Sequence, residues 1–183
     1  MKVTVANQKN LQVVSNLLGA ARDWHLATTP EVWPVFPLEA ISRDIAEELV
    51  YLFSIDSVIV ATVTITETDP LIWDGSEDPA FYIHKLATRR DYAGQGLGAA
   101  IIEWIKGHAL RSQKRFLRLD TWATNAGLKK YYVKQGFTHI KTKSFPVDSP
   151  LPDHYRGASM NLFEMVLAED ALYQMRRELS YGL

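Results

Sequence analysis

Apolar residues recur along this chain with two spacings, and each spacing predicts one kind of element. A return every three to four residues places apolar side chains on one face of a helix. This spacing predicts helices over residues 11–21, 38–49, 97–110, 125–135 and 168–179. Shorter runs that alternate, or that are apolar and β-branched throughout, are typical of strands. They predict strands over residues 2–6, 50–55, 58–66, 81–87, 115–121, 137–143 and 160–167.

The connections between these segments indicate how the elements are arranged. Only Asp56 and Ser57 separate the second and third strands, which we therefore expect to form an antiparallel hairpin. Longer loops are predicted over residues 28–37, 68–79 and 145–157, and the loop over 68–79 is acidic. No repeat, low-complexity tract or linker interrupts the chain, and its 183 residues suit one folded unit. We expect a single mixed α/β domain over residues 1–183.

A glycine cluster lies where the 81–87 strand gives way to the following helix. Its sequence is Gly94-Gln95-Gly96-Leu97-Gly98-Ala99. The first N–H groups of a helix have no partner within the helix, and the helix dipole adds partial positive charge there. Glycines let a phosphate approach these N–H groups closely. The cluster therefore predicts an anion site, above all for a pyrophosphate, although the same glycines also suit a turn that binds no ligand.

Composition removes several classes of function. The net charge is −1, which gives no reason to expect a nucleic acid or an anionic membrane as partner. There is no cysteine, which excludes disulfides, thiolate metal sites and a cysteine nucleophile and suits a reducing cytoplasm. The N-terminus lacks the apolar core of a signal peptide, and the longest apolar run, residues 58–63, is too short to span a bilayer. The five histidines show no metal-ligand spacing, so we expect no metal.

Two families of protein place glycines at such a junction. Gly94-x-Gly96-x-x-Ala99 satisfies the dinucleotide fingerprint, with Asp120 near the place of its ribose-binding acid. Against this alternative, a dinucleotide unit usually opens its domain, whereas here three predicted strands and two helices come first. The phosphate loop of nucleotide hydrolases is excluded, because no Gly-Lys-Ser/Thr follows the glycines.

A second motif favours another family. Asn125, Tyr132, Gly136 and Phe137 form the pattern N-x6-Y-x3-G-F, and Asn125 and Tyr132 are about two helical turns apart. Together with residues 86–98, Leu-Ala-Thr-Arg-Arg-Asp-Tyr-Ala-Gly-Gln-Gly-Leu-Gly, this pattern resembles the GNAT family of N-acetyltransferases. The resemblance is strong over residues 81–140 and topological elsewhere. It implies one domain built on a central, mixed but mostly antiparallel sheet of about seven strands, flanked by helices.

The resemblance also implies a cofactor, acetyl-CoA, and the residues that bind it. Backbone groups of Leu86 and Thr88 are expected to bind the pantetheine arm, residues 94–99 the pyrophosphate, and Asn125 the pantetheine side. The full set is Leu86, Thr88, Gly94, Gln95, Gly96, Leu97, Gly98, Ala99 and Asn125. Ala93 departs from the family pattern, which usually has arginine or glutamine there, and we expect Arg89 or Arg90 to supply the missing charge.

The implied reaction is attack of a neutral amine on an acetyl thioester, which needs a general acid and a general base. Tyr132 is the candidate acid, because a phenol keeps its proton at neutral pH. His84 is the candidate base, on the strand before Leu86; Asp120 or a chain of waters is the alternative. Packing in the core is the competing interpretation for Tyr132, and simple hydrogen bonding is the one for His84.

The acceptor lies outside these motifs. Trp33 in the first long loop, Trp73 in the acidic loop, and Asp120 are candidates to line its pocket, since acidic and aromatic groups suit a cationic amine. We therefore expect a cytoplasmic N-acetyltransferase of a small molecule or peptide amine. The alternatives are a nicotinamide-dependent oxidoreductase and a CoA-binding protein without catalysis. The 168–179 helix is expected either to cover the sheet or to pair two copies in a homodimer.

Overall fold

The structure is a computed structural model that describes residues 1–167. Seven strands in this part of the chain form one sheet, as predicted, and all but one neighbouring pair are antiparallel. The strands are β1 (Lys2–Val5), β2 (Val50–Ile55), β3 (Val58–Thr66), β4 (Ala80–Thr88), β5 (Phe116–Trp122), β6 (Thr138–Ser144) and β7 (Ser159–Val166), in the order β1-β2-β3-β4-β5-β7-β6. The predicted hairpin of β2 and β3 is confirmed.

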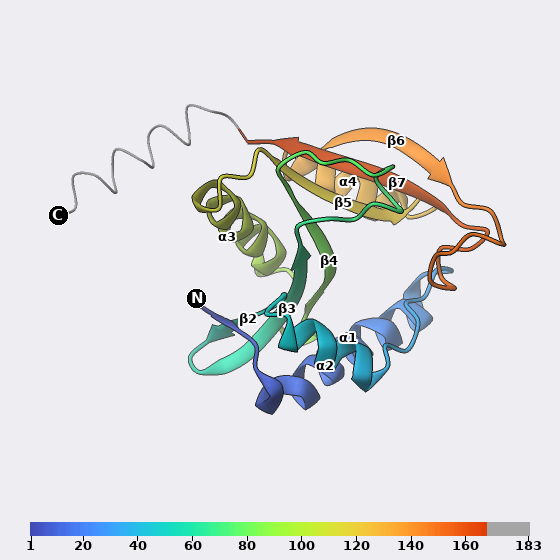
Figure 1. Cartoon of the computed structure of the whole chain (residues 1–183). Helices are drawn as coiled ribbons and strands as arrows, with labels where there is room; N and C mark the ends of the chain where they lie inside the picture. The colour runs from blue at the N-terminus through green and yellow to red at the C-terminus, as the bar shows by residue number, and fades with distance from the viewer. Residues whose placement is uncertain (168–183) are drawn as a thin grey trace.

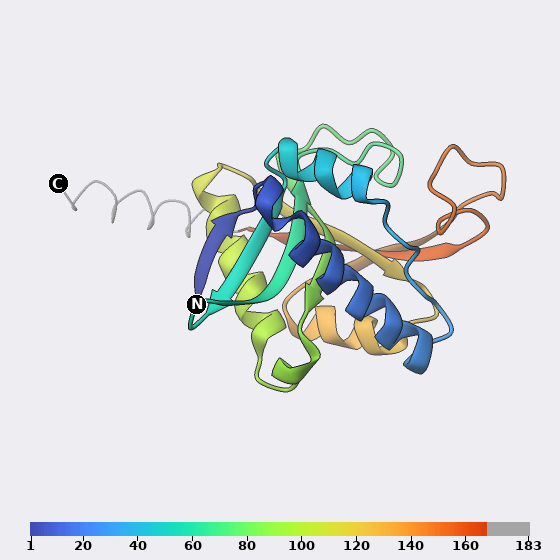
Figure 2. The same ribbon diagram turned by 90° about the horizontal axis from the view of Figure 1, so that it is seen from below.

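Helices cover both faces of this sheet. They are η1 (Gln8–Asn10), α1 (Leu11–Thr28), α2 (Leu38–Ala46), η2 (Arg90–Tyr92), α3 (Leu97–Arg111) and α4 (Ala126–Lys134). Neighbouring residues of β2 show the two faces: Leu52 packs in the core beneath α1 and α2, and Phe53 packs in the core beneath α3. Figure 1 shows α1 and α2 together below the sheet, and the turned view in Figure 2 shows them nearest the viewer.

The strands β4 and β5 run parallel to each other and then separate. Their register contains only three pairs, which end at Tyr82 and Arg118. Beyond these residues β4 and β5 diverge, as Figure 1 shows. Because side chains alternate along a strand, His84 and Asp120 lie on the same face as the last pair, two residues further on. The divergence thus opens the sheet just where two candidate site residues stand.

A bulge interrupts β4 next to this opening. The register between β3 and β4 shifts between Thr62 and Thr64, and Lys85 has a φ of +51°, which is uncommon for a residue other than glycine. The Lys85 ammonium lies 2.6 Å from an Asp44 carboxylate oxygen on α2, so that an ion pair ties α2 to the bulge. Pairing with β3 resumes after the bulge at Ala87 and Thr88, and the strand pattern of residues 81–87 did not predict this interruption.

Most predicted elements have the expected bounds, with a few differences. The helix predicted over 38–49 ends at Ala46, because Glu48 takes a left-handed conformation with φ +59° and the Leu49 N–H returns to the Asp44 carbonyl. The first helix extends to Thr28, past the expected Ala21. The predicted helix over 168–179 lies outside the described residues. None of the helices within residues 1–167 has the length and apolar character to cross a membrane.

Candidate active site

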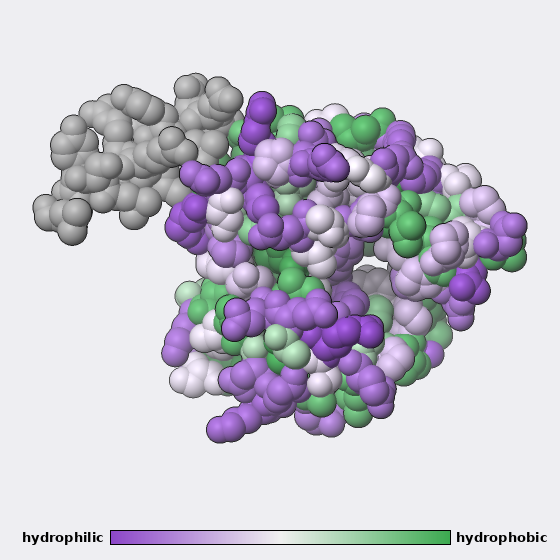
Figure 3. Space-filling view, viewed as in Figure 1, coloured by the Kyte–Doolittle hydropathy of each residue, from purple (hydrophilic) through white to green (hydrophobic). Residues whose placement is uncertain are grey.

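One cavity of about 1040 Å³ occupies the opening between β4 and β5. Its walls come from α1, the loop before α2, β4, the start of α3, β5, α4 and the loop between β6 and β7. Figure 3 shows a hollow on the face of the molecule seen in Figure 1. The cavity brings together segments from residue 21 to residue 160. It is large enough for a cofactor and a second small molecule together.

The glycine cluster forms one end of this cavity. Gly94 and Gly96 have φ values of +78° and +73°, and a Cβ added to either would meet no atom within 4 Å. Helix α3 begins directly after Gly96, and no side chain caps its first turn. The free N–H groups of that turn therefore face space that a phosphate can enter, which fits the predicted anion site.

Most of the predicted cofactor-binding residues line the cavity. They are Leu86, Thr88, Gly94, Gly96, Leu97, Gly98 and Ala99. Gln95 and Asn125 do not line it. Asn125 is instead the N-cap of α4, where its side-chain oxygen accepts a hydrogen bond from the Leu128 N–H at 2.9 Å. In this structure Asn125 fixes the start of the helix that carries Tyr132.

The two arginines that were candidates to replace the charge missing at Ala93 lie differently. Arg89 forms an ion pair with Asp91 at 2.6 Å and does not line the cavity. Arg90 lines the cavity, with its guanidinium 4.2 Å from the centre of the Trp24 ring on α1. Arg90 is therefore the better placed of the two to attract a phosphate near the glycine cluster.

Tyr132 faces the cavity from α4. Its ring packs between Phe137 and Phe163, with ring centres 5.7 and 5.9 Å away. Burial raises the pKa of Tyr132 well above its ordinary value, and the charges of Tyr131 and Asp120 add to this effect. Tyr132 therefore keeps its proton throughout the physiological pH range and is available as a donor. Tyr131 also lines the cavity, and its hydroxyl lies where a Cβ on Gly98 would point, 2.5 Å away.

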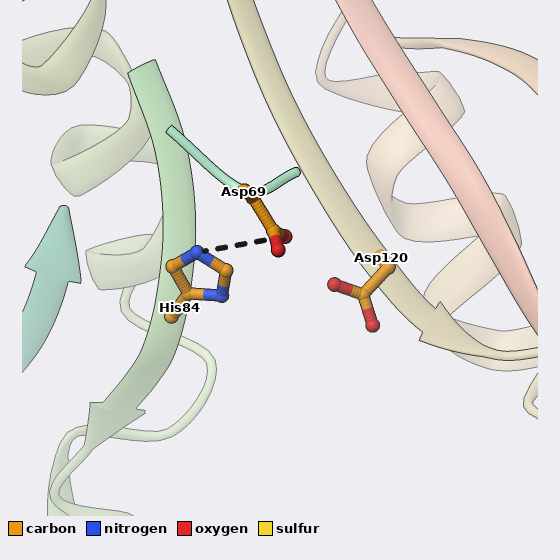
Figure 4. Close-up of side chains that lie close together, drawn as sticks. All are labelled: Asp69, His84 and Asp120. Carbon is orange, nitrogen blue, oxygen red and sulfur yellow. Dashed lines mark ion pairs between the residues drawn. The ribbon is translucent and has the colours of Figure 1, made fainter. Parts of the chain in front are cut away.

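An imidazole and two carboxylates meet at the other end of the cavity. His84 extends from β4, Asp120 from β5, and Asp69 from the loop between β3 and β4 that enters the opening (Figure 4). One ligand atom from each residue lies within 4.8 Å of those of the other two. His84 Nε2 is 3.9 Å from Asp69 Oδ2. Sequence reasoning placed His84 and Asp120 in the site but missed Asp69.

Both carboxyl groups hold protons more strongly than usual. Burial raises the pKa of Asp120 to about 7, the charge of Asp69 acts in the same direction, and a hydrogen bond from Tyr155 opposes them. Burial likewise raises the pKa of Asp69 to about 6, against a backbone hydrogen bond from Ile72 and the charge of Lys143. Burial disfavours the ionised form of a carboxyl, which accounts for the direction of both shifts, and the charge of Asp69 adds to the shift of Asp120.

The pKa of the imidazole shifts in the opposite direction to the pKa values of the carboxyl groups. Burial lowers the pKa of His84 to about 4; the charge of Lys85 adds to this shift and that of Asp44 opposes it. The nitrogen Nε2 lies 3.2 Å from the Thr66 hydroxyl oxygen, within hydrogen-bond distance. His84 is therefore neutral at physiological pH and takes up a proton only weakly.

Two loops fix the carboxylates in place. In the loop between β6 and β7, Tyr155 donates a hydrogen bond to Asp120 at 3.4 Å. The loop that carries Asp69 is held by Lys143 of β6, which donates to the Ile72 carbonyl at 2.8 Å, and by the buried Arg118, which donates to Ser76 at 2.8 Å. The sequence analysis placed the acidic loop near the acceptor but did not identify these contacts, because they join segments far apart in the chain.

Aromatic rings line the cavity beside the carboxylates. Trp122 follows Asp120 by two residues on β5, and His25 of α1 lies edge-on to Trp33 at 5.2 Å and to Trp122 at 6.5 Å. Trp33 thus lines the cavity. Trp73 does not: it packs against the Arg118 guanidinium, 4.7 Å from its ring centre, outside the cavity.

Comparison with known proteins identifies the family. A family model described as acetyltransferase (GNAT) family matches residues 18–137. The chain belongs to the GNAT acetyltransferase family. It is 31% identical over 102 residues to the uncharacterized N-acetyltransferase YesJ of Bacillus subtilis, a match that covers 53% of this chain and 57% of that protein. The chain thus matches little more than half the length of this curated relative.

Solved GNAT structures share the fold. A GNAT-family acetyltransferase from Listeria monocytogenes superposes with a TM-score of 0.75 at 21% identity, covering 91% of this chain and 94% of that one. An acetyltransferase from Salmonella typhimurium, solved with its cofactor acetyl-CoA, superposes with a TM-score of 0.65 at 13% identity, covering 92% and 95% of the two chains. The expected fold is therefore confirmed.

The GNAT topology leaves no place for the dinucleotide-binding alternative. Within residues 1–167, β4 and β5 are the only parallel pair of strands. A dinucleotide-binding fold needs a run of parallel strands joined by crossover helices, with the ligand at the point where strand order reverses. Gly94, Gly96 and Ala99 therefore match that fingerprint by sequence alone.

Proposed function

We propose that this protein transfers an acetyl group from acetyl-CoA to a primary amine of a small molecule or peptide, with both substrates bound at once. One observation carries the proposal: a single cavity contains both the glycine cluster of α3 and the His84–Asp120 pair. Family membership supports the acetyl donor, and so does the Salmonella relative that was solved with acetyl-CoA. A direct reaction needs both substrates in one space.

Residues at the α3 end of the cavity would hold acetyl-CoA. The free N–H groups that begin α3 suit its pyrophosphate, with Arg90 close by. The edge of β4 that β5 leaves unpaired beyond Tyr82 offers backbone groups at Leu86 and Thr88 for the pantetheine arm. When bound, acetyl-CoA supplies an acetyl group activated as a thioester. Because these contacts involve mainly backbone atoms, we expect Ala93, in place of the usual arginine or glutamine, to weaken the site without abolishing it.

The carboxylate of Asp120 is the proposed base. An alkylamine is mostly protonated at neutral pH, so its nitrogen must lose a proton before it can attack. A base works best when its pKa lies near the working pH, and the pKa of Asp120 is about 7. With a pKa of about 4, His84 retains a proton poorly, so its proposed part is to hold the amine through its neutral ring nitrogen.

Tyr132 is the proposed acid. Its phenol faces the cavity and keeps its proton, so it can hydrogen-bond to the sulfur and donate as negative charge develops on the departing thiolate. The packing of its ring between Phe137 and Phe163 restricts its motion, which favours a fixed direction for the hydroxyl.

Thiol release from acetyl-CoA across a panel of primary amines tests this function. Tyr132→Phe should lower the turnover number by about ten-fold or more with little change in CoA affinity, since it removes only the donor. Tyr131→Phe, which deletes the adjacent hydroxyl on the same helix, is the matched control and should lose less. An unimpaired Tyr132→Phe enzyme would remove this phenol from the mechanism. CoA binding without thiol release from any amine would favour a CoA-binding protein without catalysis.

A further inference from the structure

Asp69 and Asp120, the two carboxylates at the end of the cavity away from the glycine cluster (the acceptor end), lack the lysine or arginine partners that other buried or half-buried charges in this fold have. The guanidinium of Arg118 lies 2.8 Å from Glu164, and Lys85 lies 2.6 Å from Asp44. Within residues 1–167, neither Asp69 nor Asp120 forms an ion pair with lysine or arginine. Charges withdrawn from water are costly unless a partner neutralises them.

Hydrogen bonds within the protein satisfy these carboxylates only in part. The Asp69 oxygen Oδ2 is buried and has no hydrogen-bond partner among the described residues. Asp120 accepts a bond of 3.4 Å from Tyr155, which is long for an O–H donor. Carboxylate oxygens that can accept further hydrogen bonds therefore point into the cavity from both sides of the opening (Figure 4).

The other charged groups near this pair do not neutralise it. Lys143 acts on Asp69 from β6 at a distance, but its ammonium bonds to the Ile72 carbonyl and to Asp74. His84, the third member of the cluster, is neutral at physiological pH. A cation that enters the cavity would therefore meet two carboxylates that no lysine or arginine within residues 1–167 neutralises.

The wall next to the pair indicates what the cation is attached to. Trp122 lies two residues beyond Asp120 on the same face of β5, and His25 and Trp33 continue the aromatic lining toward α1. Such rings offer apolar contact area and attract cations to their faces. A ligand that placed a positive group between the carboxylates would lay its remaining atoms against these rings.

We propose that Asp69 and Asp120 together bind the ammonium group of the acceptor, and that the acceptor is a primary alkylamine with an apolar or aromatic body packed on Trp33 and Trp122. This inference rests on the proposed acetyltransferase function and names its substrate class. The acceptor binds in the cavity beside the glycine cluster. The two carboxylates determine that its ammonium group enters first.

The reaction of such an acceptor balances without any further reagent. One ammonium N–H bond breaks as Asp120 accepts the proton, and the freed electron pair forms a bond to the acetyl carbon. The carbon–sulfur bond then breaks, the sulfur takes a proton from Tyr132, and the new amide nitrogen gives up its second proton, which restores the phenol. The Asp120 proton passes to solvent. The products are one amide, one thiol and one proton from one ammonium and one thioester.

Binding can be measured separately from catalysis. N,N-dimethyl-2-phenylethylamine carries the charge and the ring but has no N–H to lose once its ammonium is deprotonated, so it gives no stable amide. At pH 8 with CoA present, it should raise the melting temperature of the wild-type protein, whereas the neutral 2-phenylethanol should not. Asp69→Asn and Asp120→Asn should each weaken its binding by about ten-fold or more, because each removes a charge-assisted contact. Glu77→Gln, an exposed change on the same loop as Asp69, is the control and should bind normally.

The outcomes separate this inference from the function on which it rests. Equal binding of the alcohol and the amine, or unchanged amine binding by both asparagine variants, would overturn it even if thiol release is normal. Zn²⁺ and Mn²⁺ form a separate arm: stabilisation by either ion that Asp69→Asn abolishes, with none by the amine, would make the cluster a metal site and refute the ammonium proposal. Binding in the expected order, with the amine above the alcohol and the wild-type protein above both asparagine variants, would support it.

Discussion

Replacing Asp120 by asparagine should make the protein more stable at neutral and alkaline pH while it impairs the proposed reaction. The native carboxyl is held in a cavity where its ionised form is disfavoured by burial and by the charge of Asp69. Asparagine has nearly the same shape, carries no charge and can still accept the hydrogen bond from Tyr155. The substitution thus removes an electrostatic cost without opening a cavity.

The magnitude follows from the pKa of Asp120, which rises from 3.8 to about 7. A carboxyl whose pKa is raised by folding costs nothing below its unfolded pKa. Its cost grows as pH rises from the unfolded to the folded pKa and stays constant above that. A shift of roughly three units at about 1.36 kcal/mol each gives a cost of about 4 kcal/mol above pH 7. Between about pH 5 and about pH 8, the stability of Asp120→Asn relative to wild type should rise by about 3 kcal/mol.

Urea unfolding of both proteins at the two pH values measures this difference. Glu77→Gln removes an exposed carboxylate from the neighbouring loop and should show a stability difference that hardly changes with pH. A stability difference for Asp120→Asn that is the same at both pH values, or a loss of stability that grows with pH, would refute the argument. It would mean that Asp120 ionises near its ordinary pKa and is unsuited to act as the base.

Three further perturbations test other parts of the site. His84→Ala should keep the acidic limb of the profile of kcat/KM against pH. That limb should be centred near pH 7, because the pKa of Asp120 lies there and that of His84 does not. Loss of the limb would identify the imidazole as the base. Gly96→Ala should lower the free energy of unfolding in urea by about 1–2 kcal/mol and lower the affinity for CoA measured by calorimetry, because φ is +73° at this residue. Gly19→Ala inside α1 is the control and should be neutral or stabilising. Arg118→Met should cost about 1–3 kcal/mol in urea, since it leaves the half-buried Glu164 without its partner. Lys106→Met, which removes one member of an exposed ion pair, should change stability by at most about 1 kcal/mol.

Local pattern was sufficient for the fold and for the place of the glycines directly before α3. Each strand of the β2–β3 hairpin is a short apolar run, and a turn of only two residues leads the two strands to pair with each other in antiparallel fashion. The glycines before α3 are informative because their positive φ values depend on residues adjacent in sequence. These features are local, so residues close in the chain determine them and periodicity reveals them.

The acceptor end could be predicted only in part, because it is made by contacts between distant segments. Asp69 and Trp73 lie four residues apart in one acidic loop, and nothing in their sequence distinguishes which enters the cavity. Lys143 and Arg118, from β6 and β5, decide this by holding the loop on the sheet. The bulge at Lys85 was likewise unpredictable, since it depends on the register with β3 and on an ion pair with Asp44.

The divergence of β4 and β5 explains why a weakly stabilised cluster stands in the middle of a well-packed sheet. Up to Tyr82 and Arg118 the two strands pair, and the buried Arg118 is neutralised by acidic groups of the protein. Two residues further on, the strands have separated, and the carboxylate of Asp120 faces a cavity instead of a neighbouring strand. A protein selected for stability alone would place an apolar residue there.

The unpaired carboxylates instead retain binding energy for a cation, and its arrival would lower the pKa of Asp120 toward its ordinary value. If so, the stability that the wild-type protein lacks relative to Asp120→Asn at pH 8 should shrink when an alkylammonium ligand is added. This makes the stability cost and acceptor binding two measurements of the same electrostatic interaction.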